Sequence, residues 1–113
     1  MGVFHHMEMT HDEMSATAEK ASELLRVLSN QKRLLILCKL GEGEHSVHQL
    51  QEATGLGQST VSQQLAKLRG ERLVKARREA QSVYYSLSSH EVEALIETLY
   101  GLYCPPKCSD ADA

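Results

Sequence analysis

Three cysteines are the side chains of this 113-residue chain best suited to covalent chemistry. Cys38 falls in an apolar run, Cys104 stands directly before two prolines, and Cys108 follows in the C-terminal segment. A count this low and odd does not fit a secreted disulfide scaffold, and no Cys-x-x-Cys motif is present. In a reducing compartment such thiols serve core packing, metal binding or redox chemistry. By residue type Cys38 suits a small core position, whereas a helix end beside prolines is a poor place to bury Cys104.

The reactivity of these thiols depends on their charge environment. Cys38 and Cys104 are both expected near helix C-termini, where the helix dipole disfavours a thiolate. A neighbouring cation, Lys39 or Lys107, would have to compensate for this effect. Cys108 is interpreted as a bystander in a tail, with a role in thiol exchange as the alternative.

A second set of useful side chains, basic or hydrogen-bonding, lies between residues 58 and 87. This segment holds six Lys and Arg against two Glu, in a chain whose formal net charge is −3. Such a basic segment is typical of a surface that meets phosphate, and the alternative is an ordinary solvated helix face. Small polar residues are an odd choice for merely solubilising a helix, because Glu and Lys form better helices. The residues predicted to bind DNA are Gln58, Ser59, Thr60, Ser62, Gln63, Gln64, Lys67, Arg77, Arg78 and Gln81.

The elements that position these residues follow from apolar spacing and capping signals. Helices are predicted over about 12–28, 31–40, 46–53 and 58–69, and a last helix from Ser88 or Ser89 to about residue 104. Two β-prone runs, 73–77 and 82–87, predict a hairpin with its loop at 78–81. Val61, Leu65 and Leu68 are the inward anchors expected of the fourth helix. A helix, a glycine turn, a helix and then a basic hairpin predict a winged helix-turn-helix, mainly α with a small β-hairpin.

Length and composition suit one small domain. We expect residues 1–11 to be a flexible N-terminal tail, 12–104 the DNA-binding and dimerisation domain, and 105–113 a C-terminal tail. A monomer of this size is only modestly stable, so a homodimer through the first and last helices is expected. With no run of 18 apolar residues and no signal peptide, the chain is predicted to be soluble and cytoplasmic, without a membrane partner. No cofactor loop or catalytic Ser/His/Asp grouping is found, so neither a cofactor nor enzyme activity is expected.

Three separated motifs together resemble one family. The runs 28–37, 55–65 and 83–87 are similar to the ArsR/SmtB family of bacterial transcriptional repressors, and the likeness covers roughly residues 15–104. Within the family, Ile36-Leu37-Cys38 and Leu102-Tyr103-Cys104, with Arg78-Glu79-Ala80-Gln81, resemble the BigR, SqrR, YgaV and HlyU branch. One departure is Gln64, where many relatives carry histidine in the recognition helix.

The resemblance implies a function for two of the cysteines. Cys38 and Cys104 would become joined by a disulfide or a polysulfide on exposure to reactive sulfur species or oxidants. The homodimer would then release an operator of inverted-repeat double-stranded DNA, and so control genes of sulfide handling or redox defence. Linking the second helix to the last would change the spacing of the two reading helices.

Three other functions stay open. A metal-responsive repressor is one, but Ser46-Val47-His48 replaces the Cys-Val-Cys of arsenic and lead sensors. At the zinc positions of the family stand Ser88, His90, Gly101 and Cys104, of which two could ligate, too few for a closed tetrahedral site. His45, His48 and His90 are interpreted as surface histidines, and a weak site of His5, His6 and His11 remains an alternative. An anti-silencing activator is the second function, and a thiol oxidoreductase is the third and least supported.

Overall fold

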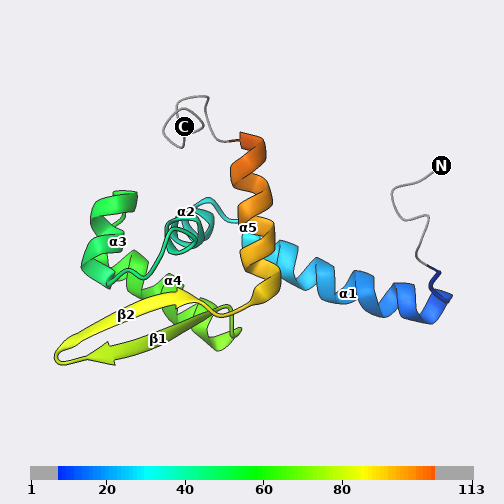
Figure 1. Cartoon of the computed structure of the whole chain (residues 1–113), viewed down its shortest axis with the longest axis horizontal. Helices are drawn as coiled ribbons and strands as arrows, with labels where there is room; N and C mark the ends of the chain where they lie inside the picture. The colour runs from blue at the N-terminus through cyan, green and yellow to red at the C-terminus, as the bar shows by residue number, and fades with distance from the viewer. Residues whose placement is uncertain (1–7, 104–113) are drawn as a thin grey trace.

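The computed structural model describes residues 8–103, and its helices and strands occur in the order that the sequence predicts (Figure 1). Cys104, Lys107 and Cys108 lie outside the described residues, as do His5 and His6. The elements are α1 (His11–Leu28), α2 (Gln31–Leu40), α3 (Val47–Thr54), α4 (Gln58–Gly70), β1 (Val74–Glu79), β2 (Ser82–Leu87) and α5 (His90–Tyr103). Five helices and one two-stranded antiparallel sheet confirm the mainly α fold with a β-hairpin.

Helix starts are set by side chains that accept hydrogen bonds from free backbone amides. Thr10 and Ser46 each form a capping box with the Glu or Gln three residues later, and Asn30 accepts from the amide of Arg33. Because Thr10 caps α1, the helix already includes His11, whereas apolar spacing predicts that residue to lie in the tail. The last helix is capped by Ser89, whose hydroxyl accepts from the Val92 amide at 3.2 Å.

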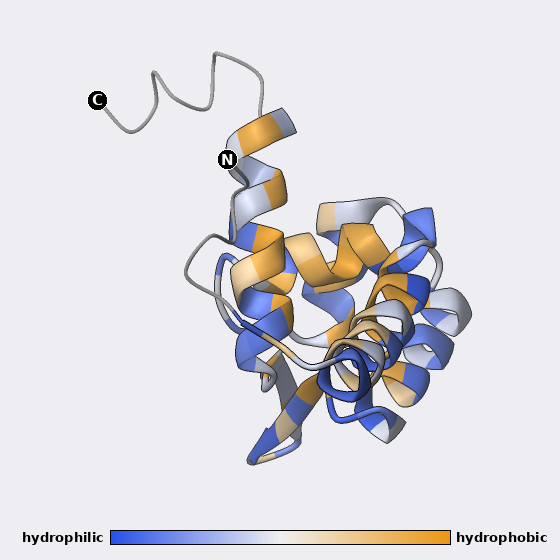
Figure 2. Ribbon diagram, turned by 90° about the vertical axis from the view of Figure 1, so that its right-hand side faces the viewer, coloured by the Kyte–Doolittle hydropathy of each residue, from blue (hydrophilic) through white to orange (hydrophobic). Residues whose placement is uncertain are grey.

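The core lies where α2, α3, α4 and α5 meet the base of the hairpin. Ile36, Leu37, Leu50 and Val92 are fully buried there, and Ile96 is 4% exposed. Figure 2 shows the hydrophobic residues gathered on the inner helices and hydrophilic residues at the hairpin's far end. Within residues 8–103, no helix combines the length and the apolar character needed to cross a membrane.

The hairpin projects from this core as the wing of the fold (Figure 1). β1 pairs with β2 from Val74↔Leu87 to Glu79↔Ser82, so the loop is only Ala80 and Gln81. The predicted four-residue loop at 78–81 is therefore wrong. The strands continue further because Ala80 adopts a φ of 55°, which permits a two-residue turn.

The first and last helices leave apolar side chains in solvent. Only Val27 and Leu28 of α1 are buried, and the rest of this helix extends away from the core (Figure 1). Leu25 is 56% exposed on α1, and Leu102 and Tyr103 are 70% and 80% exposed on α5. Isolated apolar residues on a surface are common, but the two helices predicted to form a dimer carry most of those here.

Candidate DNA interface and thiol site

Helix α4 divides cleanly into an anchored face and an exposed face. Val61, Leu65 and Leu68 are at most 1% exposed, which confirms the three predicted anchors. Of the side chains predicted to bind DNA, most are exposed on this helix and Thr60 is half-buried. The exposed ones are Gln58, Ser59, Ser62, Gln63 and Lys67. The helix therefore offers hydrogen-bonding groups of the kind that contact base edges and phosphates, on a face free of the core.

Gln64 does not share that exposed face, contrary to the expectation from the sequence. It is half-buried, and its Oε1 accepts a hydrogen bond from Nε of Arg33 in α2 at 2.9 Å. The reason is its place in the helix: Gln64 stands three residues after Val61 and four before Leu68, both of which face the core. Arg33 was not singled out from the sequence, and no local signal pairs residues 31 positions apart.

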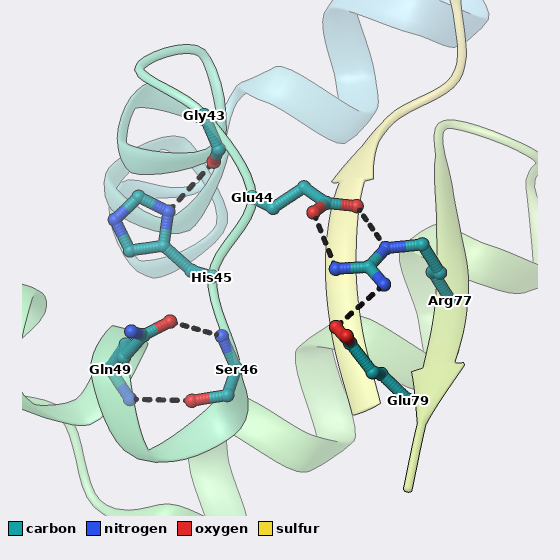
Figure 3. A network of polar contacts seen from close by, with 7 residues as sticks. All are labelled: Gly43, Glu44, His45, Ser46, Gln49, Arg77 and Glu79. Carbon is teal, nitrogen blue, oxygen red and sulfur yellow. Dashed lines mark hydrogen bonds and ion pairs between the residues drawn. The ribbon is translucent and has the colours of Figure 1, made fainter. Parts of the chain in front are cut away.

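Arg77 is held within the protein by two carboxylates (Figure 3). Its Nε and Nη2 donate to Glu44 at 3.0 and 2.9 Å, and its Nη1 donates to Glu79 at 2.9 Å. Its guanidinium also lies 5.1 Å from the ring centroid of Tyr84. Hydrogen bonding to Glu44, and then to Glu79, raises the pKa of Arg77 further, and the hydrogen bonds from Arg77 lower the pKa of Glu44. Any contact of Arg77 with DNA must therefore compete with these carboxylates.

The loop before α3 is tied to the wing next to this ion pair. His45 and Tyr85 exchange two backbone hydrogen bonds of 3.1 and 2.8 Å, so Glu44 is held beside β2, within reach of Arg77 on the neighbouring strand β1. No local sequence signal marks Glu44 as a partner of Arg77, because the two residues are 33 positions apart. Arg78 and Gln81, the other two wing residues predicted to bind DNA, are exposed at the outer part of the hairpin.

Cys38 lies at the side of α2 that faces α5. It is half-buried beside an open cleft of about 300 Å³, whose other lining residues include Gly41, Ile96 and Tyr100. Three carboxylates, Glu42, Glu93 and Glu97, complete the lining. Ile96 and Tyr100 are one helical turn apart, so the cleft follows α5 toward its C-terminal end.

The environment of Cys38 disfavours its thiolate. Burial raises the pKa of the thiol, and the charge of Glu42 raises it further, whereas Lys39 lowers it. Lys39 instead pairs with Glu42, with 3.4 Å between Nζ and Oε2. Lys39 therefore lowers the pKa of Cys38, as compensation would require, but does not outweigh burial and Glu42, because the net shift is upward. The partner expected for Cys38 from the family resemblance, Cys104, lies outside the described residues.

The histidines of the described chain have simpler roles. His48 and His90 are exposed and His45 is half-buried. His45 Nδ1 donates to the carbonyl of Gly43 at 2.7 Å, and His48 Nε2 is 2.8 Å from Glu52 (Figure 3 shows the first). Between residues 8 and 103, no group of three or more His, Cys, Asp or Glu side chains is arranged to hold a metal ion.

Known proteins share this arrangement of helices and wing. Residues 30–76 match the family of bacterial regulatory proteins called arsR. The transcriptional activator HlyU of Vibrio cholerae is 49% identical over 96 residues, which are 85% of this chain and 89% of HlyU. The chain belongs to the ArsR family. Members of this family are DNA-binding transcription regulators, so the prediction that the chain is not an enzyme is confirmed.

Solved structures of family members agree with the fold of this ArsR-family chain. Reduced HlyU from Vibrio cholerae superposes with a TM-score of 0.78, covering 82% of this chain and 98% of HlyU. The transcriptional repressor BigR from Xylella fastidiosa, at 38% identity, also has a TM-score of 0.78 and covers 84% of this chain and 94% of its own. A homodimeric winged helix-turn-helix domain from Mycobacterium bovis, 31% identical, gives 0.67 with coverages of 85% and 89%. The predicted winged helix-turn-helix and family branch are thus confirmed.

Proposed function

We propose that this ArsR-family regulator is a homodimeric repressor that binds an inverted-repeat operator and releases it when Cys38 and Cys104 are joined. DNA binding is supported by the exposed polar face of α4, which stands on three buried anchors. Arg78 and Gln81 on the wing would reach the neighbouring minor groove or the backbone, while Lys67 adds salt-dependent phosphate affinity. Arg77 contributes to this surface when DNA phosphate displaces its carboxylate partners.

The dimer is proposed to form through α1 and α5. Both helices carry exposed apolar side chains, among them Leu25, Leu102 and Tyr103. The similar Mycobacterium bovis domain is a homodimer in solution. A two-fold dimer places its two α4 helices in successive major grooves, about one helical turn or ~34 Å apart, which is why an inverted repeat is the expected operator.

The position of Cys38 is the observation that carries the sensing proposal. Its thiol lies at a cleft lined by Ile96 and Tyr100 of α5. Cys104 directly follows Tyr103, the last residue of that helix. A disulfide requires Cα atoms about 4.4–6.8 Å apart, and Tyr100, which lines the Cys38 cleft, precedes Cys104 by four residues in the sequence.

The chemistry that we propose begins at Cys104, because burial and the charge of Glu42 raise the pKa of the Cys38 thiol and so keep it in its less reactive protonated form at neutral pH. The Cys104 thiolate attacks the outer sulfur of a persulfide R–S–SH, which forms Cys104–S–SH and releases the thiol R–SH. Cys38 then loses its proton and attacks the inner sulfur, which forms the Cys38–Cys104 disulfide and releases hydrogen sulfide. The persulfide is the oxidant and is reduced to a thiol and sulfide. If Cys38 has also been persulfidated, the outer sulfur of Cys38–S–SH attacks the inner sulfur of Cys104–S–SH, hydrogen sulfide leaves, and the link is a trisulfide.

A covalent link between α2 and α5 acts on the DNA-binding surface through existing contacts. α2 packs against α3 and α4, and α5 packs against β2 of the wing. A change in the angle between α2 and α5 therefore alters the placement of both the reading helix and the wing relative to the dimer helices. Two such shifts, one in each subunit, change the spacing on which operator binding depends.

A DNA-binding titration tests this proposal. The reduced protein, Cys38→Ser and Cys104→Ser are titrated with operator duplex before and after treatment with a persulfide. Cys108→Ser is the matched control, because it removes a thiol that has no part in the switch. We expect treatment to weaken binding by the parent protein and by Cys108→Ser only. If treatment also weakens operator binding by Cys38→Ser or by Cys104→Ser, the switch that needs both thiols is contradicted.

The direction of regulation has a second candidate. HlyU of Vibrio cholerae is named an activator, whereas BigR of Xylella fastidiosa is named a repressor. An anti-silencing activator would raise transcription only where a silencing protein covers the promoter. Transcription from the operator promoter in a purified system, with polymerase and this protein alone, separates the two: a repressor lowers the transcript yield, and an anti-silencer leaves it unchanged.

A further inference from the structure

Arg33 joins three helices of the DNA-binding unit. Its Nε donates to Oε1 of Gln64 in α4 at 2.9 Å, and its Nη1 is 3.4 Å from the carbonyl oxygen of Val27 near the end of α1. Its own backbone amide, in the first turn of α2, is bound by the Asn30 cap. Arg33 is half-buried, and so is Gln64, so their contact is partly shielded from water.

This contact fixes which end of the Gln64 amide faces the protein. A guanidinium group has donors only, so the atom of Gln64 that meets it must be the carbonyl oxygen. The NH₂ group, with two donors and no acceptor capacity, is left at the other end. Gln64 stands four residues after Thr60 and three before Lys67, at the border of the exposed face of α4.

We propose that Arg33 is a positioning residue for DNA recognition, and that it makes Gln64 a donor-only contact. This inference rests on the proposed DNA binding by α4. An unrestrained glutamine reads adenine by two bonds, in which its oxygen accepts from the adenine amino group and its nitrogen donates to N7. With its oxygen committed to Arg33, Gln64 donates to an acceptor on the DNA instead. That acceptor is N7 or O6 of guanine, O4 of thymine, or a phosphate oxygen; adenine is disfavoured because an amino donor stands beside its N7 and would face the Gln64 NH₂ group unpaired.

Selection from duplexes randomised in each half-site tests the inference. The proteins are the parent, Gln64→Met, Arg33→Met and Arg33→Lys. Gln31→Met, an equivalent change at an exposed position of α2, is the matched control. Thermal unfolding at one protomer concentration shows which variants are folded. If Arg33→Met does not fold, Gln64→Met and Arg33→Lys still decide the question.

If the acceptor is a base, the parent prefers guanine or thymine at one position, and Gln64→Met loses that preference with about a fivefold drop in affinity per half-site. Arg33→Met then accepts adenine at the same position, because the freed amide can turn over. Arg33→Lys, which keeps a donor-only head group, retains the parent preference. If Arg33 only stabilised the fold, its substitution would weaken binding to all sequences equally and would not allow adenine at this position.

If the acceptor is a phosphate, Gln64→Met weakens every sequence equally. A methylphosphonate scan of the backbone then finds one linkage at which the parent and Gln64→Met bind alike. The inference is overturned if Gln64→Met weakens binding to all sequences equally and no such linkage is found. It is also overturned if Gln64→Met binds DNA as tightly as the parent, or if the parent prefers adenine and Gln64→Met abolishes that preference. A parent protein that enriches no sequence contradicts the proposed function and this inference with it.

Discussion

Replacing Leu65 by alanine tests whether α4 is a reading helix anchored in the core by three buried side chains. Leu65 is 1% exposed and packs between Val61 and Leu68, which are fully buried. Removing three buried carbon atoms costs about 2.4 kcal/mol in transfer free energy at ~0.8 kcal/mol for each. The cavity left behind adds to this, so we expect a loss of about 3 kcal/mol in the free energy of unfolding. For a small domain with a total of roughly 5–15 kcal/mol, that is a large fraction.

The matched change is Lys67→Ala, two residues further along the same helix but exposed. Its expected effect on unfolding is below about 0.5 kcal/mol, while its effect on DNA binding is large. Loss of one phosphate contact per subunit should lower the slope of log affinity against log salt by about one for each half-site.

Urea unfolding of both variants at one protomer concentration gives the stabilities, since a dimer's apparent stability depends on concentration. Operator titrations at several salt concentrations give the slopes, with Leu65→Ala measured where it is fully folded. A Leu65→Ala loss below 1 kcal/mol, or a Lys67→Ala loss as large as that of Leu65→Ala, would show that the division of α4 into anchors and readers is mistaken.

Three further changes test the wing and the thiol. Ala80→Gly should stabilise the protein by about 0.5–1 kcal/mol, because a φ of 55° strains alanine at the loop position where a two-residue turn favours glycine. Denaturant unfolding measures the change in stability, and a loss of stability would contradict this explanation. Because the pKa of Cys38 is raised, the rate of its alkylation, measured in a protein without the other two cysteines, should keep rising with pH beyond the point where the rate for an ordinary thiol levels off. Glu42→Gln should shift this dependence of rate on pH to lower pH, because the charge of Glu42 raises the pKa. Glu44→Gln should tighten DNA binding and steepen its salt dependence by freeing Arg77; unchanged titrations would argue against competition.

The ion pair of Glu44 also predicts how acid affects the wing. The folded-state pKa of Glu44 is lowered by Arg77, so the pair contributes stability above the ordinary carboxyl pKa and loses it as the pH falls through the lowered value. Because both side chains are well exposed, the contribution is small and is further reduced by salt.

The order of elements and the anchors of α4 could be predicted because both depend on local signals. The Ser46 cap, the glycine at residue 55 and the spacing of Val61, Leu65 and Leu68 are all readable within a few residues. The hairpin loop was misjudged because its shortness depends on a positive φ at Ala80, a conformation that alanine seldom adopts.

The parts that could not be predicted are contacts between distant segments. Arg33 meets Gln64, and Glu44 meets Arg77, across 31 and 33 residues. Charge and polarity marked Gln64 and Arg77 as DNA-binding candidates, but neither property shows which protein group already occupies them. The same applies to Cys38, whose cleft is completed by Glu93 and Glu97 from the distant helix α5.

Mapping the thiols of protein that has just left its operator is the most direct test of the Cys38–Cys104 switch. Reduced protein is bound to immobilised operator DNA and treated with a persulfide, and the released and retained fractions are digested without reductant for mass spectrometry. We expect the released fraction to contain one peptide pair joined through Cys38 and Cys104, directly or with one added sulfur, and the retained fraction to lack it. Released protein in which both thiols are free, or in which only Cys108 is modified, would contradict the account.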